Sequence, residues 1–307
     1  MKSKSPHATD VFWQNLPPSF KPPANFQIPS QQFKPTPLQK FQQVWLKRED
    51  QSPTGSHKFR ALVFQLSKLT TAQTPAAVLS STGNAAIAAT FYPAPIKIFL
   101  LLSPQTPPGK LAALKVDNHF RIPILSTRPI RLTKYLAAHF HLPDLRPSQD
   151  PHAAQGFQTL GFELFHQNPN LRNIFSYCTS GASLAGLAAA YQKLAKIRFF
   201  GVCLDSEPPQ LATQICRPSG GQVVKISAPE FLASRQKILT SLQAQQITPT
   251  SQEGLISLFA AQKIQPPGAT AVIFTGQEFP AQTVPQKFLR ADDFGAIEKI
   301  YAQDTAA

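Results

Sequence analysis

Lys58 stands where a lysine side chain could take part in covalent chemistry. It follows the turn-forming run Pro53-Thr54-Gly55-Ser56 and opens an apolar helical pattern. A lysine at a helix start lies near the partial positive charge of the exposed amides, which favours its neutral amine form. A neutral amine can attack a carbonyl to form a Schiff base, and pyridoxal phosphate is the usual aldehyde cofactor for this chemistry in proteins. A solvated surface lysine is the alternative, so the prediction depends on the rest of the chain.

The turn at residues 80–84 links a predicted strand to an alanine-rich helix. Small hydroxylated residues and a glycine leave backbone N–H groups open at the helix start, which suits a carboxylate or another anion. Asn84 could direct its side-chain amide to a cofactor oxygen. Ordinary helix capping by Ser, Thr or Asn is the alternative.

A second turn of small residues, 178–186, follows the predicted strand that ends at Tyr177. Its backbone could close around a phosphate, with the hydroxyls of Ser180 and Ser183 as further donors. Tight packing between strand and helix would also account for the small residues. A third turn, Thr275-Gly276, places a hydroxyl directly after an apolar strand, where it could reach a buried heteroaromatic nitrogen. In isolation that dipeptide would indicate only a turn.

Composition narrows the possible classes of protein. At 307 residues the chain is long enough for two domains, and prolines concentrated in residues 1–37 predict an extended or irregular opening segment. The net charge of +14 comes from scattered basic residues, which argues against a nucleic-acid partner and favours the attraction of anions such as a phosphorylated cofactor.

Cysteine usage and hydropathy favour a cytoplasmic protein. Cys178, Cys203 and Cys216 form no CxxC pair, so neither a disulfide framework nor a metal site is expected, and a reducing compartment fits best. No apolar run reaches membrane-spanning length, and no signal-peptide pattern follows Met1.

Short apolar runs alternate with helical patterns along the chain. The predicted strands are 44–46, 76–79, 96–102, 121–125, 173–177, 199–204, 222–226 and 271–274. The predicted helices are 59–69, 85–91, 111–116, 131–140, 157–166, 184–196, 231–245 and 252–262. This alternation predicts an α/β architecture whose parallel sheets are covered on both faces and bind ligands at the carboxyl ends of their strands.

In this order, the motifs resemble the tryptophan synthase β-like family of pyridoxal-phosphate enzymes, also called fold type II. The resemblance covers residues 36–277. The matching segments are Thr36-Pro37-Leu38, Lys47-Arg48-Glu49-Asp50, the Pro-Thr-Gly-Ser-x-Lys run that ends at Lys58, Ser81-Thr82-Gly83-Asn84, residues 156–164, residues 179–186, Pro249-Thr250-Ser251 and Thr275-Gly276.

The resemblance implies two three-layer α/β/α domains with mostly parallel sheets and the cofactor in the cleft between them. The smaller domain would span 46–146, the larger one would comprise 38–45 and 147–307, and a homodimer is expected. The resemblance implies that Lys58 is the Schiff-base lysine and the proton-transfer base, and that Asn84 binds the phenolic oxygen of pyridoxal 5'-phosphate. It implies that the substrate carboxylate is held by Ser81, Thr82 and Gly83, and the cofactor phosphate by Ser180, Gly181, Ala182 and Ser183. Thr275 would face the pyridine nitrogen.

A neutral Thr275 hydroxyl would leave the cofactor ring a weaker electron sink than a carboxylate would, which favours expulsion of a β or γ leaving group. The resemblance therefore implies a lyase for a small hydroxy-amino acid or its phosphate ester, like threonine synthase or the threonine and serine dehydratases. Cysteine synthase-type replacement on an O-acylated serine is the alternative.

A catalytically degenerate protein that binds cofactor or amino acid is the alternative from another class. The phosphate loop motivates it, because Thr179 and Ala182 stand where glycine is usual in the family. A further departure is His57, which stands where the threonine synthases and dehydratases usually have Phe and the tryptophan synthase β chains have His. Substrate specificity depends on side chains around the site, and Glu163, His152 and Arg146 are the charged candidates.

Overall fold

In the computed structural model, the structure describes residues 34–116, 119–192, 194–248, 250–284 and 288–305. These residues form two compact units, one of residues 34–61 and 153–278 and one of residues 62–152 and 279–305. Most of the predicted extended segment 1–37 lies outside the described residues, and 34–37 carry no regular secondary structure. No helix in the described part of the chain is both long and apolar enough to span a lipid bilayer.

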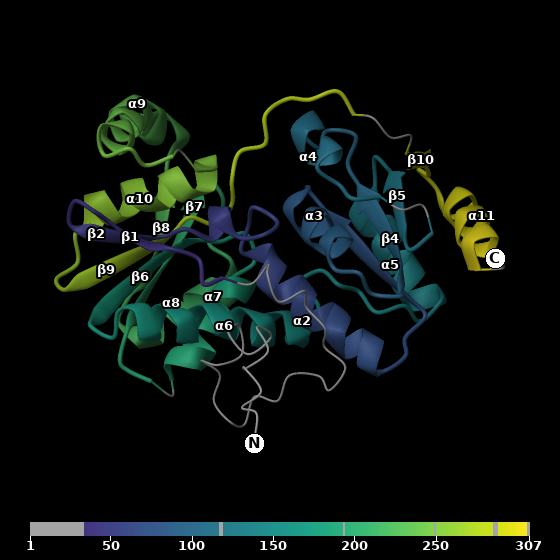
Figure 1. Cartoon of the computed structure of the whole chain (residues 1–307), viewed down its shortest axis with the longest axis horizontal. Helices are drawn as coiled ribbons and strands as arrows, with labels where there is room; N and C mark the ends of the chain where they lie inside the picture. The colour runs from purple at the N-terminus through teal and green to yellow at the C-terminus, as the bar shows by residue number, and fades with distance from the viewer. Residues whose placement is uncertain (1–33, 117–118, 193, 249, 285–287, 306–307) are drawn as a thin grey trace, which may run out of the picture. The chain divides into compact units, whose positions relative to one another are not determined.

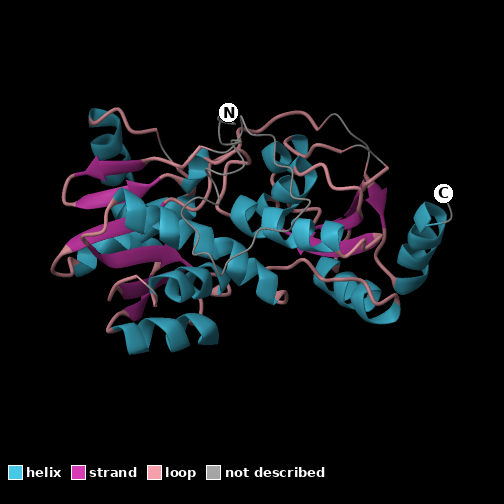
Figure 2. Ribbon diagram, turned by 60° about the horizontal axis from the view of Figure 1, so that its bottom comes forward, coloured by secondary structure: helices cyan, strands magenta, loops and turns pink. Residues whose placement is uncertain are grey.

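Helices and strands alternate along the chain, as Figures 1 and 2 show. The elements are β1 (Leu38–Phe41), β2 (Val44–Lys47), the 3-10 helix η2 (Glu49–Gln51), α2 (Lys58–Thr71), β3 (Ala76–Ser81), α3 (Asn84–Phe91), β4 (Lys97–Leu102), α4 (Pro108–Ala112), β5 (Arg121–Leu125), α5 (Pro129–His139), α6 (Pro151–Gln167), β6 (Leu171–Tyr177), α7 (Ala182–Tyr191), β7 (Arg198–Leu204), α8 (Gln210–Cys216), the 3-10 helix η3 (Arg217–Ser219), β8 (Gln222–Ile226), α9 (Ala228–Ala244), α10 (Gln252–Ile264), β9 (Ala269–Ile273), β10 (Leu289–Arg290) and α11 (Phe294–Thr305).

The first unit is built on a six-stranded sheet in the order β1-β2-β9-β6-β7-β8. Every strand pair in it is parallel except β1 with β2. Helices α9 and α10 cover one face, and α6, α7 and α8 cover the other (Figure 1). Because the strands are apolar on both faces, each face needs a layer of helices, which gives the three-layer arrangement.

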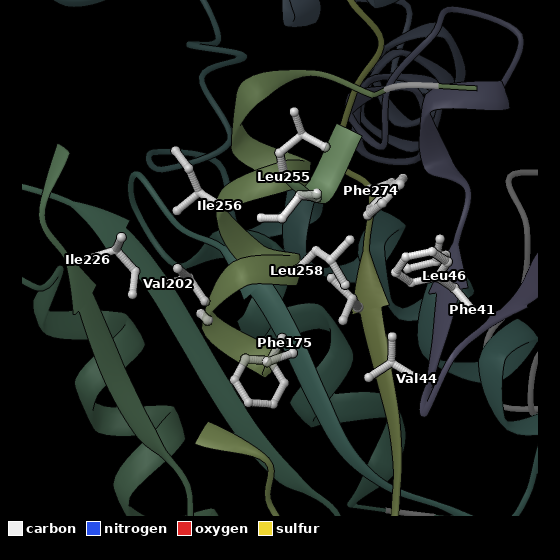
Figure 3. Packing of buried hydrophobic residues seen from close by; sticks show 14 of the residues in the cluster. Phe41, Val44, Leu46, Phe175, Val202, Ile226, Leu255, Ile256, Leu258 and Phe274 are labelled. Carbon is white, nitrogen blue, oxygen red and sulfur yellow. The ribbon is translucent and has the colours of Figure 1, made fainter. Parts of the chain in front are cut away.

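Packing on the first of these faces is dense and apolar. Leu255, Ile256 and Leu258 of α10 lie in one cluster with Phe175 of β6 and with Phe274, which directly follows β9, as Figure 3 shows. All five side chains are almost completely buried. Each such side chain contributes about 1.5–3 kcal/mol relative to an exposed one, so this layer fixes the strands whose ends form the site.

The second unit has a four-stranded parallel sheet in the order β10-β5-β4-β3. On one face, Leu132 and Leu136 of α5 and Ile297 of α11 pack against strand residues such as Phe99. An isolated bridge between Val78 and Asp144 extends the ladder beyond β3.

The predicted α/β class with mostly parallel sheets is confirmed. Three helices were predicted with wrong boundaries. The helix expected at 157–166 begins at Pro151, where a proline in the first turn loses no hydrogen bond. The helix expected at 111–116 lies at Pro108–Ala112, because Pro108 occupies the first turn, where the missing N–H costs nothing. The helix expected at 184–196 ends at Tyr191, where the amides of Leu194 and Ala195 turn back onto the Tyr191 carbonyl. The elements β1, α8, β10, α11 and the 3-10 helices η2 and η3 were not predicted.

The compact units divide the chain at Ala61 and Ala153 and place residues 279–305 with the second unit. The domains expected from the sequence begin and end at 46 and 146 instead, and that assignment stays a prediction. The division after Ala61 falls inside helix α2, so the boundary between the units does not coincide with the end of a helix or strand that the sequence could indicate.

Candidate active site

Lys58 is the first residue of α2, and the residues before it are hydrogen-bonded to the segment after β9. The His57 amide donates to the Thr275 carbonyl at 3.0 Å, and the Gln277 amide donates to the Gly55 carbonyl at 2.8 Å. Gly55 has φ of +68°, and a Cβ there would lie 2.5 Å from the Gln277 side chain, so this close approach requires glycine. The structure therefore brings the predicted residues Lys58 and Thr275 close together.

The Lys58 amine is partly buried among weakly polar groups. Its Nζ lies 5.7 Å from the centre of the Phe157 ring. Burial lowers the pKa of Lys58 to about 8, against an ordinary lysine value of 10.5, and the nearby Cys178 opposes this shift. The direction agrees with the sequence argument, but the cause is desolvation and not the helix dipole. At neutral pH a larger fraction of this amine is unprotonated than of a surface lysine.

His57 is buried and neutral. Burial lowers its pKa to about 3, and the positive charge of Lys58 acts in the same direction. The ring Nδ1 lies 2.7 Å from the Thr275 carbonyl oxygen. Because a carbonyl can only accept, Nδ1 carries the proton and donates it. His57 therefore fixes Thr275 with both its amide and its ring.

The predicted phosphate-binding residues Ser180, Gly181, Ala182 and Ser183 form the turn between β6 and α7. Gly181 takes the N-cap position with φ of +87°, and no side chain caps the helix. The Ala182 amide makes a long hydrogen bond of 3.5 Å to Ser180 Oγ, and the helix start remains a suitable place for an anion. A Cβ on Gly181 would lie 2.8 Å from the Ala212 amide nitrogen, so close packing against α8 also requires the glycine. Phosphate binding and tight packing, offered as alternatives from the sequence, both agree with this geometry.

Cys178, directly before that turn, is a buried thiol. Burial raises its pKa to about 12, so it is protonated at neutral pH and is a poor nucleophile. Its Sγ lies 3.2 Å from the Ser176 carbonyl oxygen. We therefore assign Cys178 a packing role next to the Lys58 amine.

A cluster of buried ionic groups lies two residues beyond Lys58, around Arg60. The Arg60 guanidinium donates to both Glu49 carboxylate oxygens at 2.7 and 2.8 Å and to Glu163 Oε2 at 3.0 Å. Lys47 pairs with the other Glu163 oxygen. Two cations and two anions therefore compensate each other in the interior. We call Lys47, Glu49, Arg60 and Glu163 the ionic cluster.

Polar neighbours complete the hydrogen bonding of the ionic cluster. The Thr36 amide donates to Glu163 Oε1 at 2.9 Å, and the Thr36 hydroxyl donates to Glu49 Oε1. The bonds from Arg60 and Thr36 lower the pKa of Glu49 to about 2 against the effect of its burial. A buried carboxylate that keeps its charge in this way is stable only while its partners stay in place.

In the second unit, the turn after β3 leads into α3. Its N-cap Gly83 has φ of +128°, and a Cβ there would lie 2.5 Å from the Lys110 side chain. Ser81 Oγ accepts hydrogen bonds from the Gly83 amide at 3.0 Å and the Ala86 amide at 3.3 Å. Ser81 therefore acts as a local cap, the alternative considered from the sequence, while Thr82 is exposed. The Asn84 side-chain oxygen is buried without a partner among the described residues.

These groups fit a phosphorylated pyridine aldehyde in chemical terms. The first unit provides an amine of lowered pKa, an uncapped helix start and the Thr275 residue at the end of β9. Buried hydroxyls without partners in the described part of the chain also occur near these turns, on Ser56 and Ser251. Polar atoms of this kind are unusual in a protein interior and suit a polar ligand.

Comparison with known families identifies the chain. The model of a family described as "Pyridoxal-phosphate dependent enzyme" matches residues 29–276. The chain belongs to this family. The predicted cofactor, pyridoxal 5'-phosphate, is thereby confirmed, as is the resemblance to fold type II.

A relative with an assigned activity is the biosynthetic L-threonine dehydratase IlvA of Haemophilus influenzae, 26% identical over 235 residues. The match covers 67% of this chain and 45% of the relative, so the chain spans less than half of that protein. Similar solved structures include a threonine deaminase of T.th. (TM-score 0.63, 19% identity, 80% of this chain and 93% of that chain) and maize serine racemase (TM-score 0.65, 15% identity, 89% and 93%). An O-acetylserine-dependent cystathionine β-synthase from Helicobacter pylori is also similar (TM-score 0.65, 17% identity, 84% and 97%). At these identities the structures support the fold alone.

The ionic cluster is the part of the site region that sequence reasoning missed as a unit. Glu163 was named as a charged candidate, and it belongs to this cluster. The other two candidates form local pairs: Arg146 with Asp144, and His152 with Asp150. The signal that could have revealed the cluster is the occurrence of ionisable residues within otherwise apolar buried segments.

Proposed function

We propose that this protein is a pyridoxal-phosphate-dependent lyase acting on a small hydroxy-amino acid or its phosphate ester, like threonine synthase or the threonine and serine dehydratases. The observation that carries the proposal is the Lys58 amine of a member of this family, whose pKa of about 8 results from burial. The adjacent residue, His57, is hydrogen-bonded to the Thr275 carbonyl and keeps Thr275 near this amine. The similarity to a threonine dehydratase supports the substrate class.

When bound, the cofactor supplies an aldehyde that condenses with a primary amine and a ring that withdraws electrons from the substrate α-carbon. Lys58 would provide the amine and then accept the substrate α-proton at Nζ. Because its pKa lies nearer neutral pH than that of an ordinary lysine, Lys58 can both accept and return a proton.

Positioning is the proposed role of the other residues. The amides and hydroxyls of Ser180, Gly181, Ala182 and Ser183 would hold the phosphate at the helix start. Thr275, held by His57, would present a neutral hydroxyl to the pyridine nitrogen. A neutral partner favours loss of a leaving group over transamination.

The turn of the second unit has its own proposed role. We assign the substrate carboxylate to Ser81, Thr82 and Gly83, and the phenolic oxygen of the cofactor to Asn84. The partnerless Asn84 oxygen supports a polar ligand there. Ser81 keeps its hydroxyl proton for donation because its oxygen acts only as an acceptor in the turn.

Spectroscopy and substrate turnover test this proposal. The purified protein should show an absorbance band near the visible edge, and Lys58→Ala should lose the band and almost all turnover. Lys68→Ala, on the same helix, is the matched control and should keep both. Incubation with threonine or serine should release a 2-oxo acid and ammonia. A colourless protein that cannot be reconstituted with cofactor would contradict the proposal and favour the degenerate alternative.

Cysteine synthase-type replacement on an O-acylated serine is the second candidate. The structural similarity to an O-acetylserine-dependent enzyme motivates it. Product formation that requires O-acetylserine and sulfide, with no 2-oxo acid from threonine or serine, would decide for this branch. We also propose a cytoplasmic location, since the three cysteines are free and buried. The proposed homodimer rests on the resemblance to the family.

A further inference from the structure

The first unit contains a large basic cavity at the edge of its sheet opposite the candidate active site. Strands β6, β7, β8 and β9 are parallel, so their amino ends share one edge and their carboxyl ends share the other. The cavity is lined at the amino ends, by Arg172 of β6, Arg198 of β7 and the residues Gly220 and Pro267 before β8 and β9. Thr275 and the 180–183 turn follow carboxyl ends. The two sites are therefore separate.

Basic side chains that form no ion pair among the described residues line this cavity. Its volume is about 1090 Å³, and the described lining residues include Arg172, Lys196 and Arg198 but no Asp or Glu. None of these three cations takes part in the ion pairs of the described residues. A concave surface lined by charges of one sign concentrates ligands of the opposite sign.

Arg198 is held in place by neutral oxygens. Its Nε donates to the Asn173 side-chain oxygen at 2.8 Å, and its Nη2 donates to the Pro267 carbonyl at 2.5 Å. Asn173 is itself completely buried and donates to Thr270 Oγ1 at 3.0 Å. The guanidinium is thus oriented before any ligand arrives, and its charge is not neutralised by the groups that orient it.

These cations could instead serve to neutralise the partial negative charge at the carboxyl end of α7, because α7 ends at the cavity. Backbone amides already bond carbonyls of that terminus, however. The Gln192 amide donates to the Ala188 carbonyl at 2.9 Å, and the amides of Leu194 and Ala195 donate to the Tyr191 carbonyl at 3.0 and 3.1 Å. The guanidinium groups of the two arginines donate elsewhere, to oxygens of Leu171, Asn173 and Pro267.

The remaining wall is largely apolar, with Tyr191, Ile197, Phe199 and Ile215 among its residues. Tyr191 is nearly completely buried, and its hydroxyl has no partner among the described residues. Ligand pockets typically combine an apolar wall with a few fixed polar groups.

We propose that this basic cavity binds an organic phosphate, in which a doubly charged group meets Arg172, Lys196 and Arg198 and an apolar body meets the Ile197 and Ile215 wall. Nothing in the proposal depends on the reaction at Lys58. Its test uses the cofactor-loaded protein, so that the 180–183 turn does not capture the probe.

Calorimetric titration with 1-naphthyl phosphate tests the cavity. One equivalent should bind per chain, while 1-naphthol and inorganic phosphate, which carry only one half of the proposed chemistry, should bind at least about tenfold more weakly. The double variant Arg172→Glu and Lys196→Glu should weaken binding of 1-naphthyl phosphate by about tenfold or more. The control Lys134→Glu and Lys237→Glu changes the net charge equally at two exposed sites outside the cavity and should bind normally.

A second variant tests the space rather than the charge. Ala195→Trp, at a lining residue, should fill the cavity and abolish binding without altering the absorbance of the bound cofactor. The proposal is overturned if the loaded protein binds no naphthyl phosphate, or if the control double variant weakens binding as much as the cavity variant. It is also overturned if the cavity variants leave binding intact and change the oligomeric state instead, which would identify the surface as a contact between copies.

Discussion

At the scale of single residues, the protonation of Lys58 controls whether it can react. Only the unprotonated amine attacks an aldehyde, and burial sets the pKa of Lys58 to about 8. Covalent binding of pyridoxal phosphate to the cofactor-free protein should therefore rise with pH around a midpoint near 8 and decline below it. Absorbance recorded between about pH 6 and pH 10 measures this midpoint. A midpoint near the ordinary lysine value of 10.5 would contradict the assigned environment.

His57 should make the folded state sensitive to acid. Its folded pKa of about 3 lies below the ordinary value of 6.5, so between these values the unfolded chain binds a proton that the folded chain does not. Stability should fall as pH decreases from 6.5 toward 3. In His57→Phe this part of the pH dependence should disappear, at a cost of about 0.5–1.5 kcal/mol for the lost hydrogen bond to Thr275.

Urea unfolding at several pH values measures the effect of His57. The exposed His166 provides the control, and His166→Phe should keep the acid dependence of the parent. An unchanged slope in His57→Phe would show that His57 is not buried in its neutral form.

Residue types and short spacings indicated the lysine and the turns, because the chemistry of those sites depends on local backbone. The sequence could not indicate that Lys47 and Glu163 form an ion pair, since 116 positions separate them. Likewise, the helix start predicted a lowered Lys58 pKa, but the size of the shift depends on the surrounding residues, among them Phe157 and Cys178. Interactions that join distant segments require the tertiary structure.

At the scale of elements, the ionic cluster ties together β2, η2, α2 and α6, since Lys47, Glu49, Arg60 and Glu163 lie on these four elements in that order. Arg60→Ala would leave two buried carboxylates without their shared partner. Removal of one member of a buried ion pair typically costs about 3–5 kcal/mol. We expect a loss of this size in the free energy of unfolding, measured with urea.

Arg60→Lys is the graded variant for this prediction. A lysine keeps the charge but lacks the planar fork that contacts both Glu49 oxygens, so its loss should be smaller than that of Arg60→Ala. Lys225→Ala, which breaks an exposed pair with Glu207, should change stability little. Equal effects of Arg60→Ala and Lys225→Ala would contradict a buried role for the ionic cluster.

Two of the elements that were not predicted carry only a weak local pattern. Edge strand β1 has four residues, of which only Phe41 is fully buried, so its sequence shows little alternation. Helix α8 places only Ala212 and Cys216 in the interior. Both elements depend on a small number of tertiary contacts. Their sequences are too short and too weakly patterned to be told apart from loops.

At the scale of the whole molecule, each compact unit combines segments that are far apart in the sequence. The first unit joins residues 34–61 to residues 153–278, and the second joins 62–152 to 279–305. Prediction of the α/β class succeeded because alternation of strands and helices is a property of the entire chain. No sequence pattern indicates that residues 279–305 belong to the second unit, since β10, the strand by which they join its sheet, has only two residues.

Cofactor binding should stabilise the folded molecule through the first unit, which holds Lys58, the 180–183 turn and Thr275. A ligand that binds only the folded state at a concentration of 100 times its Kd adds about 2.7 kcal/mol. Calorimetric unfolding of the loaded protein should therefore show a Tm several degrees above that of the cofactor-free protein. Lys58→Ala loses the covalent contribution and should show a clearly smaller increase, whereas Lys68→Ala should match the parent. Because two units need not unfold together, a second transition whose Tm does not change with cofactor is compatible with this prediction. If no transition has a higher Tm with cofactor than without it, the prediction is wrong.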